Sequence, residues 1–434
     1  MSTRTPVTGI APPPAPRRLL RAVCTLSAAA LLLACGGGGG DVAGVGTGGT
    51  GSFSIGTVTG FGSVFVNGVR YEDDGARLID DDGTVTILGS SANPLRVGMV
   101  VEVTGSDDGG VRSATQIAYG AELEGPVTAV DAAAGTFRVF GVTVRTTSTT
   151  VYEDIAGVAS LAAGNVVEVH GLPDSAGRIV ATHVEREATS EAAYAADGGT
   201  YRLRGPVDGL LSSSSGSTFT LRGVAIRTDG ATQLDGTPTE GASVSVRLNP
   251  TLQSDGRYLA QRVKVRSASF DDLPSSAEAE IEGYVSDLDA SAGNLSVAGY
   301  PVRLAANVAY EDGTAADLKN GVRIEAKGSV TNGVLVAARI EFESLDDDDD
   351  GDDDEVPGGL PEFEFKGTAA CIECGASSGS FGIKGVTVTY DARTEFDDGL
   401  SGTTLEGRIV EVEAVAETST GGTVYRATKI ELDD

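Results

Sequence analysis

The sequence contains no tryptophan and only two histidines, and aromatic residues make up 5% of its 434 positions. The two histidines, His170 and His183, are too few to build a convincing Ser-His-Asp arrangement. A phosphate-binding glycine loop is also missing, because Gly60 and Gly62 are followed neither by a third glycine nor by a helical pattern. We therefore expect a protein that is not an enzyme and needs no cofactor for catalysis.

Basic residues are also scarce. The chain has 32 Lys and Arg against 62 Asp and Glu, so its formal net charge is −30. A strongly acidic surface repels nucleic acid and anionic lipid headgroups, and it favours solubility and cation binding. This charge predicts that nucleic acid is not a partner.

Long apolar runs are absent except for residues 22–34, which follow the basic residues Arg17, Arg18 and Arg21. This run is shorter than the roughly 20 apolar residues that a membrane-spanning helix needs. A basic segment followed by a short apolar segment is typical of a secretory signal.

The signal ends in Leu32, Leu33, Ala34 and Cys35, which resembles the lipobox of a bacterial lipoprotein. An ordinary secretory signal, the alternative, usually has small residues at both positions −3 and −1, and Leu32 fits this poorly. We expect cleavage before Cys35, lipidation of Cys35, and a flexible glycine-rich tether over residues 35–54. Resemblance to lipoproteins with Gly after the cysteine implies the outer membrane.

Glycine is abundant, with 60 residues, and four landmarks recur in the same order five times after the tether. They are a Gly-x-Val motif, a strand that enters and leaves a glycine, a glycine followed by an alternating strand, and a strand beginning with alanine. The landmark residues are Gly56, Gly125, Gly205, Gly283 and Gly367; Gly68, Gly141, Gly223, Gly299 and Gly385; Gly98, Gly164, Gly241, Gly321 and Gly407; and Ala114, Ala181, Ala260, Ala337 and Ala427.

The strand after the third landmark glycine alternates in a fixed register. In the first copy Val101 and Val103 flank Glu102, a period-two pattern with one apolar face that predicts a half-buried strand. The landmark glycines indicate sharp turns that need positive φ or no Cβ.

Acidic residues follow the third strand of every copy, for example Glu153 and Asp154. A short segment with a final glycine comes next, which predicts a helical turn capped by these acids. A sugar or cation site is the alternative interpretation of the acids.

Each copy therefore contains five short strands in about 65 residues, which is the size and order of an OB-like closed barrel. We predict an all-β tandem array of about five small five-stranded barrels joined by polar linkers, with an SH3-like barrel as the alternative. The predicted ranges are 1–34 for the signal peptide, 35–54 for the tether, 55–119, 121–186, 201–266 and 279–342 for four barrels, 343–362 for an acidic linker, and 363–432 for the fifth barrel.

These landmarks resemble the domain of unknown function 5666 family of bacterial envelope proteins, and the most family-like stretch is residues 56–68. The resemblance extends from Ile55 to Leu432. Its motifs are structural glycines and core valines, so it implies a fold and no catalytic residues. The fifth copy departs at Ala369, Ala370 and Cys371, and the third copy has shorter, serine-rich turns.

Cys371 and Cys374 form a CxxC motif in the fifth copy. A redox dithiol normally lies at a helix N-terminus in a βαβ setting, which this pattern lacks, and zinc would need two further ligands. In an oxidising compartment, a local disulfide that staples a loop is the favoured interpretation.

The second candidate site is the acidic linker. Asp346, Asp348, Asp350, Asp352 and Asp354 match the oxygen-ligand spacing of an EF-hand loop, but Pro357 stands where the bidentate carboxylate belongs. A self-repelling, extended and solvated linker is the favoured interpretation, and weak calcium binding is the alternative.

His170 and His183 are expected at the surface, because His183 occupies a position held by polar residues in the other copies. Together these features predict a non-catalytic, lipid-anchored protein of the outer membrane that faces the periplasm or the cell surface. Its barrels would bind or space an envelope partner, a polysaccharide or a protein. Calcium-dependent adhesion through the Asp-rich linker and a redox accessory role through Cys371 and Cys374 are the alternatives.

Overall fold

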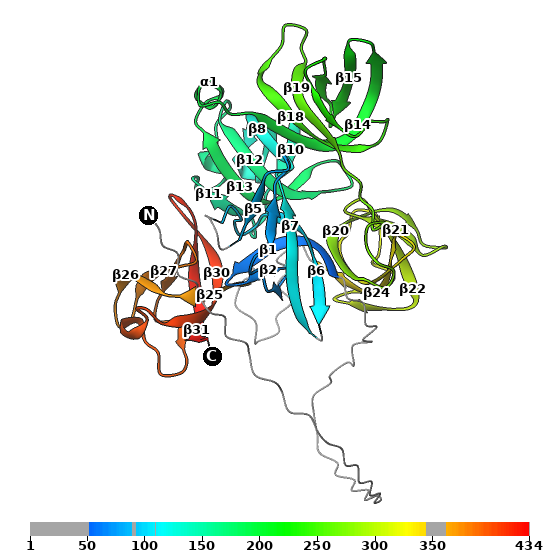
Figure 1. The fold of residues 1–434 in the computed structure, drawn as a ribbon. Coiled ribbons are helices and arrows are strands. Elements are labelled where there is room, and N and C mark those ends of the chain that lie inside the picture. The colour runs from blue at the N-terminus through cyan, green and yellow to red at the C-terminus, as the bar shows by residue number, and fades with distance from the viewer. Residues whose placement is uncertain (1–51, 89–92, 109, 344–361, 434) are drawn as a thin grey trace, which may run out of the picture. The chain divides into compact units, whose positions relative to one another are not determined.

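The computed structural model describes residues 52–88, 93–108, 110–343 and 362–433. The described residues form short strands, three single turns of 3-10 helix and one short α-helix, α1 (Glu191–Ala196) (Figure 1). None of the helices in these ranges is long and apolar enough to span a membrane. The predicted all-β class is confirmed.

The second barrel shows the strand order most completely. Its first three strands form an antiparallel meander, and its third strand pairs in parallel with the last. The last strand pairs with the fourth, and the fourth pairs with the first, which closes the barrel. The first two strands are β8 (Leu123–Asp131) and β9 (Thr136–Val139), and the third is divided into β10 (Val142–Arg145) and β11 (Val151–Glu153). The fourth and fifth strands are β12 (Val166–Pro173) and β13 (Ile179–Ala188). The parallel pairing of third and fifth strands is the OB-like order and decides against the SH3-like alternative.

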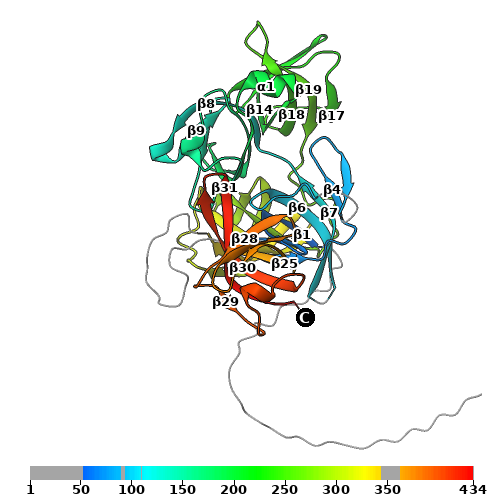
Figure 2. The same ribbon diagram turned by 90° about the vertical axis from the view of Figure 1, so that its left-hand side faces the viewer.

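The other copies repeat this order (Figures 1 and 2). The first has β1 (Ser52–Phe61), β2 (Val64–Val66), β3 (Val69–Tyr71), β4 (Arg77–Ile79), β5 (Val85–Ile87), β6 (Val100–Asp108) and β7 (Val111–Tyr119). The third has β14 (Tyr201–Ser213), β15 (Gly216–Leu221), β16 (Val224–Arg227), β17 (Gln233–Asp235), β18 (Ser243–Leu252) and β19 (Tyr258–Val265).

The fourth barrel has β20 (Glu278–Asp289), β21 (Asn294–Val297), β22 (Tyr300–Glu311), β23 (Arg323–Thr331) and β24 (Val334–Phe342). The fifth has β25 (Glu362–Thr368), β26 (Ala370–Cys374), β27 (Gly379–Ile383), β28 (Val386–Tyr390), β29 (Glu395–Phe396), β30 (Ile409–Ser419) and β31 (Gly422–Leu432). Its first strand is divided at Ala369, where its sequence departs from the other copies.

A two-residue turn joins the second and third strands of every barrel. In the second barrel Phe140 has φ 55° and Gly141 has φ 89°, and positive φ at both central residues defines the turn whose twist matches a hairpin. The same pair of positive φ values occurs at Asn67–Gly68, Arg222–Gly223, Ala298–Gly299 and Lys384–Gly385. The second landmark glycine is therefore required by the backbone, as predicted.

The Gly-x-Val glycine makes room for this turn. A Cβ atom on Gly125 would lie 2.1 Å from the ring of Phe140. In the other barrels the atoms that such a Cβ would meet also belong to the first residue of the turn, at Asn67, Arg222, Ala298 and Lys384. Two landmarks that are far apart in the sequence thus pack on each other.

A reciprocal pair of backbone hydrogen bonds joins the first strand to the third landmark glycine. The N–H of Gly164 donates to the carbonyl oxygen of Val127, and the N–H of Val127 donates to the carbonyl oxygen of Asn165, each at 2.8 Å. Gly164 has φ 90°, so a residue with a Cβ would be strained there. The other four barrels repeat the pair at Val58 and Gly98, Val207 and Gly241, Val285 and Gly321, and Ala369 and Gly407.

The fourth landmark alanine lies opposite a β-bulge. Between the last two strands of the second barrel the register shifts between His170 and Gly171, and Gly171 pairs with Ala181. Comparable shifts lie opposite Ala114, Ala260, Ala337 and Ala427. Inward-facing residues beside the bulge, such as Val169 and Val184, are fully buried and form the barrel core.

The prediction that acids cap a helical turn is wrong. A 3-10 turn follows the third strand at Val158–Ser160 and Gly402–Thr404, but its N-cap residues are Gly157 and Ser401. The second acid after the strand instead adopts left-handed backbone geometry, with φ 60° at Asp154. Asp312, Asp398 and Gly236 take the same geometry at the equivalent positions. Asp tolerates this conformation better than most residues, which explains its recurrence.

We expect Gly125→Ala to destabilise the second barrel, because the new Cβ would collide with the Phe140 ring. In a Phe140→Ala background the same substitution should cost about 1 to 3 kcal/mol less, since the ring is gone. Hydrogen exchange of peptides from β8 and β9, measured by mass spectrometry on the full chain, reports this local stability.

Gly230→Ala is the matched control. No atom outside its chain neighbours lies within 4 Å of a Cβ placed at Gly230, so exchange should not change. An equal cost of Gly125→Ala with and without the Phe140 ring would contradict the packing explanation.

Candidate functional site

Two of the predicted sites lie outside the described residues. These are the lipidation site, Cys35, and the acidic run of Asp346, Asp348, Asp350, Asp352 and Asp354. Lipidation and calcium binding at these residues therefore remain predictions.

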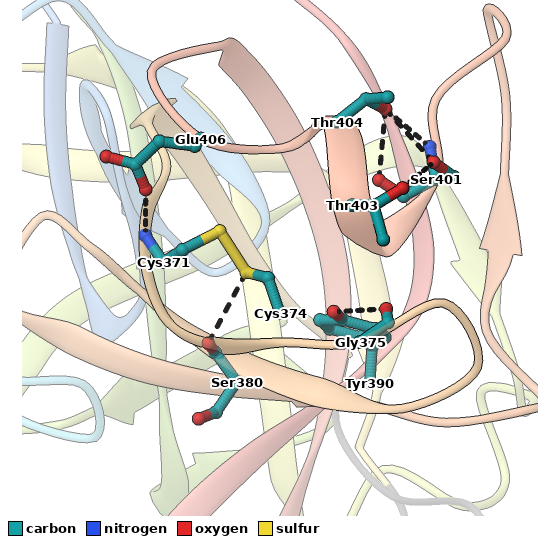
Figure 3. Close-up of a disulfide and its surroundings, with 9 residues drawn as sticks. All are labelled: Cys371, Cys374, Gly375, Ser380, Tyr390, Ser401, Thr403, Thr404 and Glu406. Atoms are coloured by element: carbon teal, nitrogen blue, oxygen red, sulfur yellow. Dashed lines mark hydrogen bonds between the residues drawn. A yellow bond between two sulfur atoms is a disulfide. The ribbon is translucent and has the colours of Figure 1, made fainter.

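The structure joins Cys371 and Cys374 in a disulfide, as predicted, with Cα atoms 5.7 Å apart (Figure 3). Both belong to β26, which pairs with β27. The N–H of Cys371 donates to Oε2 of Glu406 at 2.6 Å, and the hydroxyl of Tyr390 donates to the carbonyl oxygen of Gly375 at 2.9 Å. The motif lies in a strand and not at a helix N-terminus, which fits a bridge that holds the hairpin.

The expectation that His170 and His183 lie at the surface is wrong, because each is only 1% exposed. They face each other across β12 and β13, and β13 is the central strand between β11 and β12. Residues of the first barrel cover His183, because its Nδ1 lies 2.8 Å from the carbonyl oxygen of Val97 and a Cβ on Gly98 would lie 3.1 Å from the Cβ of His183. The residues at the position of His183 in the other barrels are Gln116, Arg262, Arg339 and Lys429.

Glutamates surround these histidines. Glu168 pairs across the strands with Glu185, and Glu153 on β11 is the parallel partner of Glu185. Side chains two residues apart on a strand share a face, so Glu185 lies on the same face as His183. We call this group the acid–histidine cluster; its members are Glu153, Glu168, His170, His183 and Glu185.

Carboxyl groups in and beside the cluster have raised pKa values. Burial, with added repulsion from Glu153 and Glu187, raises the pKa of Glu185 to about 8. Burial and the charge of Glu168 raise the pKa of Glu187 to about 7. None of the described arginines and lysines of the second barrel forms an ion pair with Glu185 or Glu187. The barrel therefore concentrates more negative charge here than its own basic residues neutralise.

The histidines differ in their partners. Nε2 of His170 lies 2.8 Å from Oε1 of Glu168. Burial tends to raise the pKa of Glu168, but this hydrogen bond and the nearby charges outweigh burial and lower it. Burial, followed by the proximity of His170, lowers the pKa of His183 to about 4. His183 is therefore a neutral imidazole at ordinary pH.

Two members of the cluster, Glu168 and Glu185, belong to a row of three residues that crosses the first, fourth and fifth strands of every barrel. In the second barrel the row is Glu124, Glu168 and Glu185. The other rows are Ile55, Glu102 and Ala118; Arg204, Ser245 and Lys264; Glu282, Glu325 and Glu341; and Lys366, Glu411 and Glu431. The scaffold is constant while the charge of the row changes.

The fourth barrel has a second all-glutamate row, and cations of the same barrel form ion pairs with its members. Nζ of Lys327 lies 3.0 Å from Oε2 of Glu325, and Arg323 forms an ion pair with Glu282. Burial, together with a hydrogen bond to Glu280 and the charge of that residue, holds the pKa of Glu325 well above the usual glutamate range. This pair of carboxyl groups is thus favoured in a state that retains a proton.

The sequence contained part of this signal. A Glu between two apolar residues of the fourth strand marks the middle of the row in four of the five barrels, at Glu102, Glu168, Glu325 and Glu411. The other two members lie on strands whose register with the fourth depends on a bulge and a barrel closure. The sequence pattern alone does not fix that register, so it does not predict the cluster.

A family model described as a domain of unknown function, DUF5666, matches residues 124–185, 204–264, 282–341 and 373–431. Together these matches cover more than half of the sequence. The chain belongs to the DUF5666 family. The matches fall on the second to fifth barrels. The first barrel lies outside them, although its strands pair in the same order.

None of the curated proteins matches this DUF5666 chain. Among solved structures, Drosophila Unr CSD456 is 14% identical, with a TM-score of 0.13, and the match covers 53% of this chain and 96% of that chain. A Streptococcus pneumoniae multidomain protein with nucleic acid binding domains is 9% identical, with a TM-score of 0.12, over 54% of this chain and 73% of that chain. Likenesses with such TM-scores carry no argument about what this chain binds.

The prediction that nucleic acid is not a partner is wrong as an exclusion, and we withdraw it. Net charge is summed over the whole sequence, whereas the sign of the charge at the row differs between barrels. The row of the third barrel, for example, contains Arg204 and Lys264. The sum therefore does not exclude a partner class for each barrel.

We expect the fourth barrel to lose stability as pH rises. Burial beside Glu280 raises the folded-state pKa of Glu325, so its stabilisation is present below the ordinary glutamate pKa and is lost as pH rises through the raised value. Between about pH 5 and about pH 9 the loss should be roughly 2 kcal/mol, after allowance for partial solvent screening.

Glu325→Gln should flatten this dependence, because the amide cannot ionise. Hydrogen-exchange protection of β20 and β23, corrected for intrinsic rates, measures it in the full chain. The third barrel, which has Ser245 at the equivalent position, is the internal reference. A pH dependence in Glu325→Gln as steep as in the natural chain would show that another group is responsible.

Proposed function

We propose that the chain is a non-catalytic, lipid-anchored protein of the cell envelope whose barrels bind or space an envelope partner, a polysaccharide or a protein. The observation that carries this proposal is the contrast between a constant scaffold and variable rows. Backbone hydrogen bonds, glycines and small alanines recur in all five barrels, whereas the row changes from Glu124, Glu168 and Glu185 to Arg204, Ser245 and Lys264.

Catalysis depends on one set of groups held in one geometry. A tandem binding protein instead gains from several small surfaces, because each additional contact raises the effective concentration of the next. Repetition of one barrel with different side chains in its row therefore favours a tandem binding protein over an enzyme. The disulfide of Cys371 and Cys374 also fits an oxidising compartment outside the cytoplasm.

The anchor part of the proposal rests on Cys35 and on the glycine-rich residues that follow it. We expect Cys35→Ser to move the protein from the membrane fraction to the soluble envelope fraction, because the thioether-linked lipid cannot form. Cell fractionation with immunoblotting measures the shift. Cys24→Ser is the control and should leave the protein in the membrane, since that residue precedes the cleavage site. Membrane retention of Cys35→Ser would refute lipidation.

The binding part predicts that affinity grows with the number of barrels. Co-sedimentation of the full chain with purified peptidoglycan sacculi should exceed that of a chain lacking residues 199–342 by at least about tenfold, through lost multivalency. Lipopolysaccharide and single-stranded DNA serve as parallel probes, since neither sugar nor nucleic acid is excluded. Equal sedimentation of both chains, or none with any probe, would contradict multivalent binding and leave the spacer role.

A further inference from the structure

Two buried nitrogens in the acid–histidine cluster have no hydrogen-bond partner among the described residues, Nδ1 of His170 and Nε2 of His183, and only the second lies beside carboxylates of β11 and β13. Nε2 of His183 is buried and accepts or donates no hydrogen bond among the described residues. It faces a carboxylate, with Oε2 of Glu153 at 3.7 Å, which is too long for a hydrogen bond. A buried polar atom without a partner is costly, so it calls for a specific explanation.

Three ligand atoms converge at this nitrogen. One carboxylate oxygen each of Glu153 and Glu185 and one ring nitrogen of His183 all lie within 4.8 Å of one another. Two ligands on one tetrahedral ion, each about 2.0–2.2 Å from it, are about 3.3–3.6 Å apart. Small rotations of the two glutamates would therefore bring all three atoms to the ion without movement of the strands.

We propose that Glu153, His183 and Glu185 bind a divalent transition-metal ion of the zinc type on the outer wall of the second barrel. The three side chains come from β11 and β13, so all three ligands belong to one barrel. The proposal does not depend on the lipid anchor or on an envelope partner. It also differs from calcium binding in the acidic linker, because it uses other residues.

The donor set selects the class of ion. Calcium and magnesium prefer oxygen ligands, whereas one imidazole and two carboxylates suit zinc and its neighbours in the first transition series. Such a set leaves a fourth position for water or another oxygen. A bound cation would also compensate the repulsion among glutamates that the barrel does not neutralise with arginine or lysine.

Surrounding groups orient the ligands. Nδ1 of His183 lies 2.8 Å from the carbonyl oxygen of Val97, which favours the tautomer with its proton on Nδ1 and a free lone pair on Nε2. Nε of Arg96 lies 3.3 Å from Oε1 of Glu153, the oxygen that does not face His183. These contacts leave Nε2 and Oε2 as the atoms available to the ion.

The fourth barrel provides the natural comparison. Carboxylate oxygens of Glu325, Glu341 and Glu343 also lie within 4.8 Å of one another. There, however, Nζ of Lys327 lies 3.0 Å from Glu325 and 3.7 Å from Glu341, and no histidine is present. A lysine already supplies the positive charge, so this second trio is a control and not a second site.

Isothermal titration of the full chain with zinc chloride, after chelation and with a purification tag free of histidine, tests the proposal. We expect one zinc ion per chain. His183→Asn and Glu185→Gln should each weaken binding at least about tenfold, since each removes a ligand. Glu341→Gln, the equivalent substitution in the fourth barrel, should leave binding unchanged. Retained affinity in His183→Asn, or equal weakening by Glu341→Gln, would overturn the site.

A variant could lose zinc binding because it fails to fold, so a second measurement uses the chain without substitutions. The sequence has only two histidines, so nitrogen-15 NMR of the imidazoles is simple to assign. Zinc should shift the Nε2 signal of His183 strongly and that of His170 little. Zinc binding that moves neither signal, or binding only at large excess over the chain, would show an adventitious ion and refute the proposal.

Discussion

The reciprocal backbone hydrogen bonds between the first strand and the glycine before the fourth strand are the constraint on which each barrel depends. They join two segments that are distant in sequence, and they require left-handed geometry at Gly164 and its counterparts. Because only main-chain atoms take part, the bonds specify almost nothing about neighbouring side chains. The Gly-x-Val glycine adds the space that lets the adjacent turn pack on the same strand.

This division explains which features the sequence reveals. Glycines at positive φ and alanines opposite a bulge are dictated by the backbone, so they recur visibly and predict the strand number, the turns and the closed barrel. Cys371 and Cys374 were also predictable, because two cysteines three residues apart can meet within one hairpin. The capping role of the acids was misjudged, since Asp suits a helix start and a left-handed turn equally well.

The acid–histidine cluster could not be predicted for a different reason. Its members come from three strands, and their approach depends on inter-strand register and on the bulge beside His170. His183 occupies a position that is polar in every barrel, and its burial follows from the packing of Val97 and Gly98 on it and not from the pattern. A cluster whose members meet only through pairing between strands needs the coordinates to be found. A turn that requires one residue type, such as glycine, can be predicted from the sequence.

The closure contact also sets an order of events while the chain is synthesised from its N-terminus. Val127 cannot form its pair of bonds until Gly164 and Asn165 have emerged, and the third strand has no parallel partner until β13 follows. Each barrel therefore remains open through most of its own synthesis and closes only at its end. Contacts of this range fold slowly, so separate, self-contained closure lets each barrel finish before its neighbour begins.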